Sequence, residues 1–422
     1  MNRLLIAMTL TLALGAAASA GTWPQWRGPQ NNGISEELNL PAEWTDSKNM
    51  LWKLPLPGMG SSTPCVWGNR IFLTSGDTSD QLLAMCISTD GKEVWRKVLN
   101  KGAAMSRKAD EGNNASPSPS TDGKHVWFFV GTGEVACFDF DGNEVWKFNA
   151  QERYGRFKMG YGMHITPALY AGHLYFQLLH DNGQNVISVN ASTGKDDWKV
   201  SRISDGRAEN LHSYASPFVW TDGKDALLVT HGNDYTIGHD LKDGKEVWRV
   251  EGLNPKGNYN PTLRFVASPV CTPDLIVIPT AKRAQVVAIK PTARGKVAAG
   301  SEFEVWRRPS GTPDVPSPLV HDGLVYIVRE DGTFQCWDAK TGKDVYPTQR
   351  LHQNRHRASP VYADGKVYAI SRDGVVSVVK AGPKFELLGS NRMQDDITAS
   401  PAVADGRIYL RGFKNLYAIG TK

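Results

Sequence analysis

Seven segments of this 422-residue chain carry Asn, His, Tyr, Arg or Asp two to five residues ahead of a Ser-Pro or Thr-Pro pair. These side chains carry charge, exchange hydrogen bonds or, in the case of His, titrate near neutral pH. Brought together, they would form a polar pocket for a ligand or partner. The candidate binding residues are Asn114, His164, His212, Tyr214, Arg264, Arg355, His356, Arg357 and Asp396.

The same set contains donors for two kinds of metal site. Asp395, Asp396 and Asn114 offer oxygen ligands, and the three His residues offer ring nitrogens. Neither group has the spacing of a known metal motif. The chain also has no G-x-S-x-G elbow, no phosphate-binding Gly loop and no C-x-x-C pair. We therefore assign no catalytic residue and no metal ligand.

The elements that must position these residues form an internal repeat. A Ser-Pro or Thr-Pro pair, followed by an apolar residue in every unit but the second, recurs eight times, with its proline at Pro64, Pro117, Pro167, Pro217, Pro269, Pro318, Pro360 and Pro401. In residues 359–388, short alternating segments are separated by Gly-containing turns, which is typical of antiparallel hairpins. Eight such units predict an all-β fold, an eight-bladed β-propeller of four-stranded antiparallel blades.

The ends of the chain predict how the ring closes. The last unit stops after three strands, and the missing strand is found near the other end, in "MLWKLPL" around Trp52. Pairing this N-terminal strand with the last unit would remove two exposed sheet edges. The repeated "DGKEVW" at 90–95 and 243–248 is interpreted as a tight turn followed by a Trp that packs on the next blade.

The repeated pattern, seen in "LLAMCISTDGKEVWR" and "TFQCWDAKTGKDVYP", resembles the PQQ-binding-like (quinoprotein alcohol dehydrogenase-like) β-propeller superfamily over residues 44–422. Residues 21–43, with "TWPQWRGPQNNGIS", look like the N-terminal extension of its secreted members. One branch implied by the resemblance comprises PQQ-dependent dehydrogenases, and the other comprises non-catalytic propellers similar to BamB. The chain lacks adjacent cysteines and a C-x-x-C-H haem motif, so it is closer to the BamB-type branch.

Residues 1–20 are predicted to be a signal peptide, with a basic start, an apolar stretch and a small-residue site ending at Ala20. No Cys follows this site, so we expect a periplasmic or secreted protein without a lipid anchor. No later apolar run is long enough to span a membrane. The net charge of +5 is too small to indicate nucleic acid as a partner.

Together these features predict an exported, non-catalytic scaffold of the cell envelope, and we expect a monomer. Its expected partner is an envelope protein, a peptide, or a small anionic or glycan ligand, held on the face that carries the long loops. No cofactor is expected in this interpretation. The alternative is a PQQ-dependent dehydrogenase of alcohols or sugars that uses PQQ with calcium.

Overall fold

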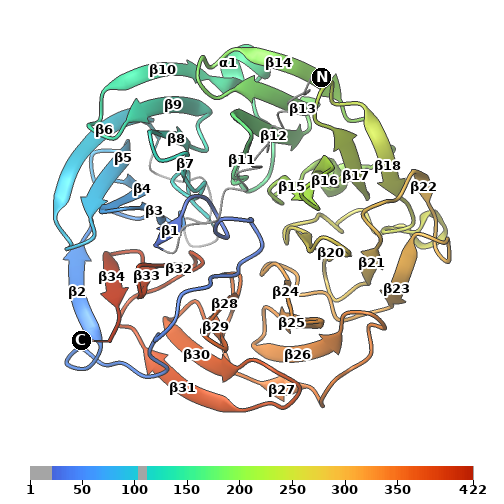
Figure 1. Ribbon diagram of the computed structural model, residues 1–422. Coiled ribbons are helices and arrows are strands. Elements are labelled where there is room, and N and C mark those ends of the chain that lie inside the picture. The colour runs from blue at the N-terminus through green and yellow to red at the C-terminus, as the bar shows by residue number, and fades with distance from the viewer. Residues whose placement is uncertain (1–20, 103–111, 422) are drawn as a thin grey trace, which may run out of the picture.

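The computed structural model describes residues 21–102 and 112–421. Within these residues, eight β-sheets stand like blades around a central axis (Figure 1). Consecutive strands of each blade pair antiparallel, from the axis outward. The predicted all-β, eight-bladed propeller is therefore confirmed. No helix of the described residues is long and apolar enough to cross a membrane.

The first four blades follow the chain in order, each from its inner to its outer strand. Their strands are β3 (Cys65–Trp67), β4 (Arg70–Gly76), β5 (Gln81–Ser88), β6 (Glu93–Lys101); β7 (Ser120–Thr121), β8 (His125–Phe129), β9 (Glu134–Asp139), β10 (Glu144–Asn149); β11 (Ala168–Tyr170), β12 (His173–His180), β13 (Gly183–Asn190), β14 (Asp196–Ser201); and β15 (Phe218–Thr221), β16 (Ala226–Gly232), β17 (Tyr235–Asp240), β18 (Glu246–Val250).

The last four blades are built in the same way. Their strands are β19 (Val270–Cys271), β20 (Ile276–Ile278), β21 (Val286–Ile289), β23 (Glu304–Arg308); β24 (Leu319–His321), β25 (Leu324–Val328), β26 (Thr333–Asp338), β27 (Gln349–Arg350); β28 (Val361–Ala363), β29 (Lys366–Ile370), β30 (Val375–Lys380), β31 (Leu387–Arg392); and β32 (Ala402–Ala404), β33 (Arg407–Arg411), β34 (Asn415–Ile419), β2 (Met50–Pro55).

The remaining elements are short. Strand β22 (Gly295–Val297) pairs parallel to β18 at the outer edge of blade 4, and β1 (Thr22–Trp23) pairs with β3 on the axial side of blade 1. The helical segments lie in connections between blades and are α1 (Ala150–Tyr154), η1 (Ala208–Leu211) and η2 (Lys256–Asn258).

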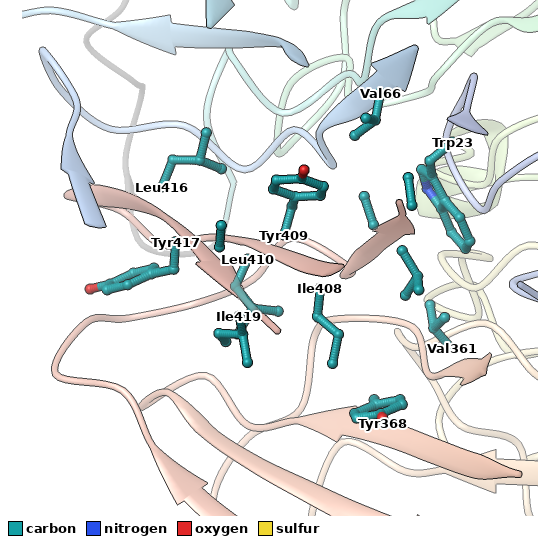
Figure 2. Packing of buried hydrophobic residues seen from close by; sticks show 14 of the residues in the cluster. Trp23, Val66, Val361, Tyr368, Ile408, Tyr409, Leu410, Leu416, Tyr417 and Ile419 are labelled. Atoms are coloured by element: carbon teal, nitrogen blue, oxygen red, sulfur yellow. The ribbon is translucent and has the colours of Figure 1, made fainter. Parts of the chain in front are cut away.

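Strand β2 closes the ring, as the sequence predicts. It pairs antiparallel with β34, and Trp52 stands opposite Ala418. A continuous apolar core then joins blades 7, 8 and 1, and Figure 2 shows Val361 and Ile408 within it. Burial of this apolar surface stabilises the junction between the two ends of the chain.

The outer-strand tryptophans join successive blades. The indole Nε1 of Trp95 donates to the carbonyl of Phe140 at 2.9 Å, and Trp52, Trp146, Trp198 and Trp306 make the same bond to the next blade. The turn glycine of "DGKEVW" is required here, because Gly91 has φ +83° and an added Cβ would lie 2.8 Å from the Trp52 ring. The repeated motif is a docking element.

The Ser-Pro and Thr-Pro pairs form a second set of contacts between successive blades, close to the axis. The backbone N–H of each hydroxyl residue donates to the hydroxyl of the next one at 2.8–3.0 Å, and within the described residues seven such bonds run through Thr63, Ser118, Thr166, Ser216, Ser268, Ser317, Ser359 and Ser400. The second unit uses Ser118 and Pro119, so the assignment of its repeat to Pro117 was wrong by two residues.

The N-terminal segment 22–35 crosses the axis and contacts six blades. Trp23 is fully buried and pairs with Val66 of blade 1 (Figure 2). The Arg27 guanidinium donates to the Pro318 carbonyl at 2.7 Å, ahead of blade 6. Further bonds reach blades 2, 3, 7 and 8, through Thr121, Leu169, Tyr362 and Val403. We call this segment the axial plug.

We predict that Ser268→Ala lowers the free energy of unfolding by about 1–3 kcal/mol, because the buried Ser216 N–H loses its acceptor. Urea denaturation measures the change. Ser192 is exposed in a surface turn, so Ser192→Ala is the matched control and should change stability by less than about 0.5 kcal/mol. Equal stability of the two variants would contradict a structural role for the hydroxyl chain.

Candidate functional site

A cavity of about 410 Å³ lies on the axis between the hydroxyl chain and the loops that lead into the blades. All eight motif hydroxyl residues line it, and the axial plug contributes Trp26. Four cations and two carboxylates complete the charged part of its wall: Arg264, Lys282, Arg355, Arg357, Asp314 and Glu330. We call this space the central cavity. Hydroxyl and charged groups line it, and Trp26 of the plug supplies one of its aromatic surfaces.

One side of the central cavity combines aromatic rings with an arginine. Tyr161 and His164 precede blade 3, Tyr214 precedes blade 4, and the Tyr161 and Tyr214 ring centroids lie 6.0 Å apart. The Arg264 guanidinium stacks over Tyr161 at 4.8 Å and pairs with Glu209 at 2.6 Å. Burial lowers the pKa of His164, so its ring is neutral at pH 7.

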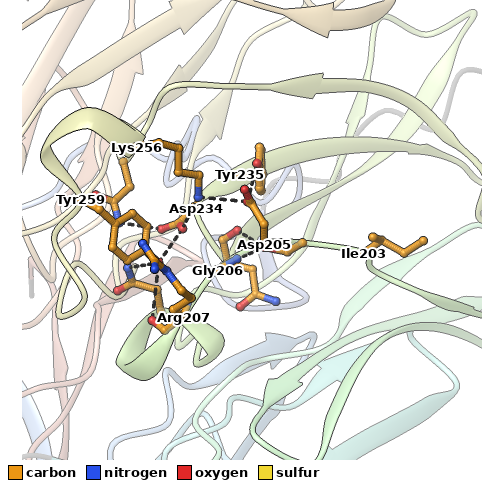
Figure 3. A network of polar contacts seen from close by, with 12 residues as sticks. Ile203, Asp205, Gly206, Arg207, Asp234, Tyr235, Lys256 and Tyr259 are labelled. Carbon is orange, nitrogen blue, oxygen red and sulfur yellow. Dashed lines mark hydrogen bonds and ion pairs between the residues drawn. The ribbon is translucent and has the colours of Figure 1, made fainter.

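A polar network holds the loops that carry Tyr214 and Arg264 (Figure 3). The Tyr259 hydroxyl donates to Asp234 at 2.8 Å and accepts the Arg207 N–H at 2.8 Å. Lys256 pairs with Asp205 at 3.0 Å and with Asp234 at 3.3 Å. Next to this network, the Tyr214 N–H donates to the Phe265 carbonyl, which ties the two loops directly to each other.

The opposite side of the central cavity is charged. Glu330 lies 3.3 Å from Arg357 and 3.6 Å from Arg355. Burial raises the pKa of Glu330; Arg357 and Arg355 act against this shift, and the neighbouring Asp314 adds to it. The carboxyl group is therefore held between two guanidiniums and a second acid.

Lys282 reaches the central cavity from the turn between β20 and β21. Its Nζ donates to the Thr262 hydroxyl at 2.7 Å. Among the ion pairs of residues 21–102 and 112–421, none joins Lys282 to a carboxylate. Its charge is therefore available to a ligand in the cavity.

Five of the nine residues predicted from the sequence line the central cavity: His164, Tyr214, Arg264, Arg355 and Arg357. The other four lie outside its wall. Asn114 donates to the Gly102 carbonyl at 2.7 Å, and His212 pairs with Asp181 at 2.7 Å. His356 is fully buried, with Nδ1 3.0 Å from the Asn354 carbonyl, while Asp396 is exposed.

Sequence reasoning missed Lys282, Glu330, Trp26 and the motif hydroxyls. Lys282 and Glu330 lie in hairpins between the second and third strands of blades 5 and 6, whereas the candidates came from the connections between blades. The hydroxyls carried a usable signal, since Ser or Thr precedes proline in all eight units. A recurring hydroxyl beside a residue without an N–H indicates a structural hydrogen bond.

The donor set of the central cavity does not fit PQQ with calcium. Calcium takes six to eight oxygen ligands, with carboxylates prominent among them. Here the two lining carboxyls, Asp314 and Glu330, are neighbours, and Glu330 faces two guanidiniums. Within the described part of the chain, no group of three or more His, Cys, Asp or Glu side chains could hold a metal ion. We derive no reaction step through this cofactor.

Glu330 predicts a pH dependence of stability. A carboxyl group whose pKa is raised by folding favours the folded state when protonated, and this contribution is lost as pH rises through the raised pKa. Compared with Glu330→Gln, the wild-type free energy of unfolding should fall as the pH rises from about 4 through the raised pKa. Urea denaturation across this range tests it, and a constant difference between the two proteins would contradict the assignment.

The chain is similar to known proteins in sequence. A family model described as outer membrane protein assembly factor BamB matches residues 80–348, more than half of the chain. The tetrathionate hydrolase of Acidithiobacillus ferrooxidans is 22% identical over 377 residues, which make up 86% of this chain. The chain spans 64% of the length of that relative.

Solved structures share the fold at low identity. BamB from Moraxella catarrhalis has a TM-score of 0.63 at 11% identity, with 88% of this chain and 97% of that chain covered. Quinohemoprotein alcohol dehydrogenase from Comamonas testosteroni has a TM-score of 0.70 at 13% identity, with 96% and 82% covered. The resemblance to PQQ-like repeat propellers is confirmed, and the chain belongs to the family of the outer membrane protein assembly factor BamB.

Proposed function

We propose that this protein is an exported, non-catalytic β-propeller of the cell envelope whose central cavity binds the anionic part of a ligand or partner. The observation that carries this proposal is the charge of the cavity wall, where four cations face two carboxyls. A polar cavity with excess positive charge attracts anions and selects against cations. Loops on a rigid ring are a common location for such binding residues.

Lys282 makes the largest contribution to this selectivity. Arg264, Arg355 and Arg357 each have an acidic neighbour within 4 Å, which offsets part of their charge. Lys282 has a hydroxyl neighbour instead. The motif hydroxyls around it donate or accept without adding charge. This combination suits a small organic or sulfur-containing anion, an acidic glycan, or the carboxylate of a peptide.

One relative supports an envelope location with a protein partner, and another supports an anionic ligand. BamB is described as an assembly factor, which favours a protein partner and an envelope location for this chain as well. Tetrathionate hydrolase is named for a dianionic substrate, which favours an anionic ligand. We propose binding without turnover and without a resident cofactor.

The surroundings of Gly21 fit a chain that is cleaved after Ala20. The backbone nitrogen of Gly21 lies 2.6 Å from Glu37 Oε1, and Glu37 Oε2 accepts the Gly406 N–H of blade 8 at 2.6 Å. Cleavage after Ala20 would place a new α-ammonium group at this carboxylate. The processed N-terminus would then fasten the axial plug to the last blade through an ion pair.

We predict that Lys282→Gln weakens tetrathionate binding by about tenfold, the effect of losing one charged contact. Isothermal titration calorimetry at fixed ionic strength measures the affinity. Lys245 is an exposed cation paired with Asp243 in the turn between β17 and β18, so Lys245→Gln is the matched control and should bind normally. Equal affinities for the two variants would contradict an anion site in the central cavity.

The alternative function, a PQQ-dependent dehydrogenase of alcohols or sugars, has its own test. PQQ with calcium should leave the melting temperature unchanged and support no dye reduction with alcohols or sugars. Tetrathionate should also persist when incubated with the protein. Saturable stabilisation by PQQ together with dye reduction, or consumption of tetrathionate, would contradict the non-catalytic assignment.

For the processed N-terminus, we predict that acetylating the chain that begins at Gly21 lowers its free energy of unfolding by about 0.5–1 kcal/mol, because the ion pair with Glu37 loses its positive partner. Urea denaturation measures the change. Glu37→Gln should remove the sensitivity to acetylation. If acetylation has the same effect in both proteins, the ion pair does not form.

A further inference from the structure

A second cavity of about 520 Å³ adjoins the central cavity and shares Asp314, Glu330 and Arg355 with it. Arg283 enters it from the turn between β20 and β21, and Arg350 enters it from β27. Arg329 and Asp331 come from the turn between β25 and β26. We call this space the arginine cavity. None of the functions proposed so far uses it.

The arginine cavity is not electrically balanced by its own aspartate. Three guanidiniums surround the Asp331 carboxylate, with N···O distances of 3.5 Å for Arg283, 3.6 Å for Arg329 and 3.7 Å for Arg350. Strong charge-assisted hydrogen bonds are about 2.7–2.9 Å long, so no guanidinium is locked onto this carboxylate. Over the whole wall, which also contains Arg355, Asp314 and Glu330, four guanidiniums face three carboxyls, so one positive charge is in excess.

Asp331 keeps its negative charge in this environment. Burial alone would raise its pKa, yet the Thr333 N–H, 3.1 Å from Oδ1, and the nearby Arg329 and Arg350 lower it overall. The carboxylate therefore serves as a fixed counter-charge that holds the guanidiniums near one another. Arg350 Nη1 also donates to the Asp331 carbonyl at 2.8 Å, which fixes its approach.

The turn between β20 and β21, which carries two of the cations, has an unfavourable backbone conformation. Lys282 and Arg283 have φ values of +52° and +63°, and the Ala284 N–H donates to the Ala281 carbonyl across them. Tight turns with two positive φ values strongly prefer Asn-Gly, because other side chains are strained there. Lys282 lines the central cavity and Arg283 lines the arginine cavity, so the strained turn supplies both. Such local strain commonly marks a functional site.

We propose that the arginine cavity is a binding site for a tetrahedral oxyanion, such as a phosphate or sulfate group. Three guanidiniums that approach from two turns and one strand match the several oxygens of a tetrahedral group, and the excess positive charge attracts it. Arg329 is largely buried, whereas 74% of the Arg283 side chain is exposed, so the anion enters past Arg283. The site adjoins the central cavity, and Arg283, Arg329 and Arg350 belong to the arginine cavity alone.

The test is titration of the full chain with inorganic phosphate, in a chloride buffer of constant ionic strength. We expect saturable binding that weakens about tenfold in Arg283→Gln and in Arg350→Gln. Arg294 is an exposed arginine whose Nη1 donates to backbone carbonyls, so Arg294→Gln is the matched control and should bind as the wild type does. Arg350→Lys keeps the charge but loses the planar fork, and should have intermediate affinity.

Arg283→Gly separates the effect on phosphate affinity from the effect on stability. Glycine relieves the positive φ, so this variant should melt at a higher temperature and still lose phosphate affinity. Parallel titrations with sulfate and with glycerol phosphate identify the source of the group, and saturable binding of any of the three anions supports the site. Absence of saturable binding for all three, or equal affinity in Arg283→Gln and Arg294→Gln, would overturn the proposal.

Discussion

Backbone N–H groups just before the inner strands donate to hydroxyls of the next blade, and these bonds set the geometry of the ring around the axis. Each donor and acceptor is buried, so each bond must be made for the ring to be stable. Because proline follows every hydroxyl residue, the chain has no N–H at the next position to compete. The loops that lead into the blades are consequently held around the axis, and they enclose the central cavity.

The axial plug and the outer tryptophans complete this arrangement from opposite sides. Indole-to-carbonyl bonds hold the rim of the ring, while the plug crosses its centre and presents Trp26 to the cavity. A rigid ring of this kind leaves the loops free to differ from one another without changing the fold. The binding residues that we propose accordingly lie in the parts of the repeats that differ, including the strained turn at Lys282 and Arg283.

Repetition explains why the fold was predictable from the sequence. Turn glycines, alternating strands and docking tryptophans recur in most units, so an error in one unit, such as the choice between Pro117 and Pro119, does not alter the architecture. The candidate site has no such redundancy. His356 and Arg357 are neighbours in the sequence, yet His356 is fully buried and Arg357 lines the cavity, because adjacent side chains point in different directions. Lys282 and Glu330 were missed because hairpins within the blades also reach the cavity.

The central claim is that ligands of this propeller bind at the axis on the loop-bearing face, against Trp26 and Lys282. A crystal structure of the full chain with tetrathionate tests this most directly. We predict ligand density in contact with Lys282, enclosed by the motif hydroxyls and supported by Trp26. Density on the outer blade edges, with the central cavity containing only water at saturating ligand, would contradict the account.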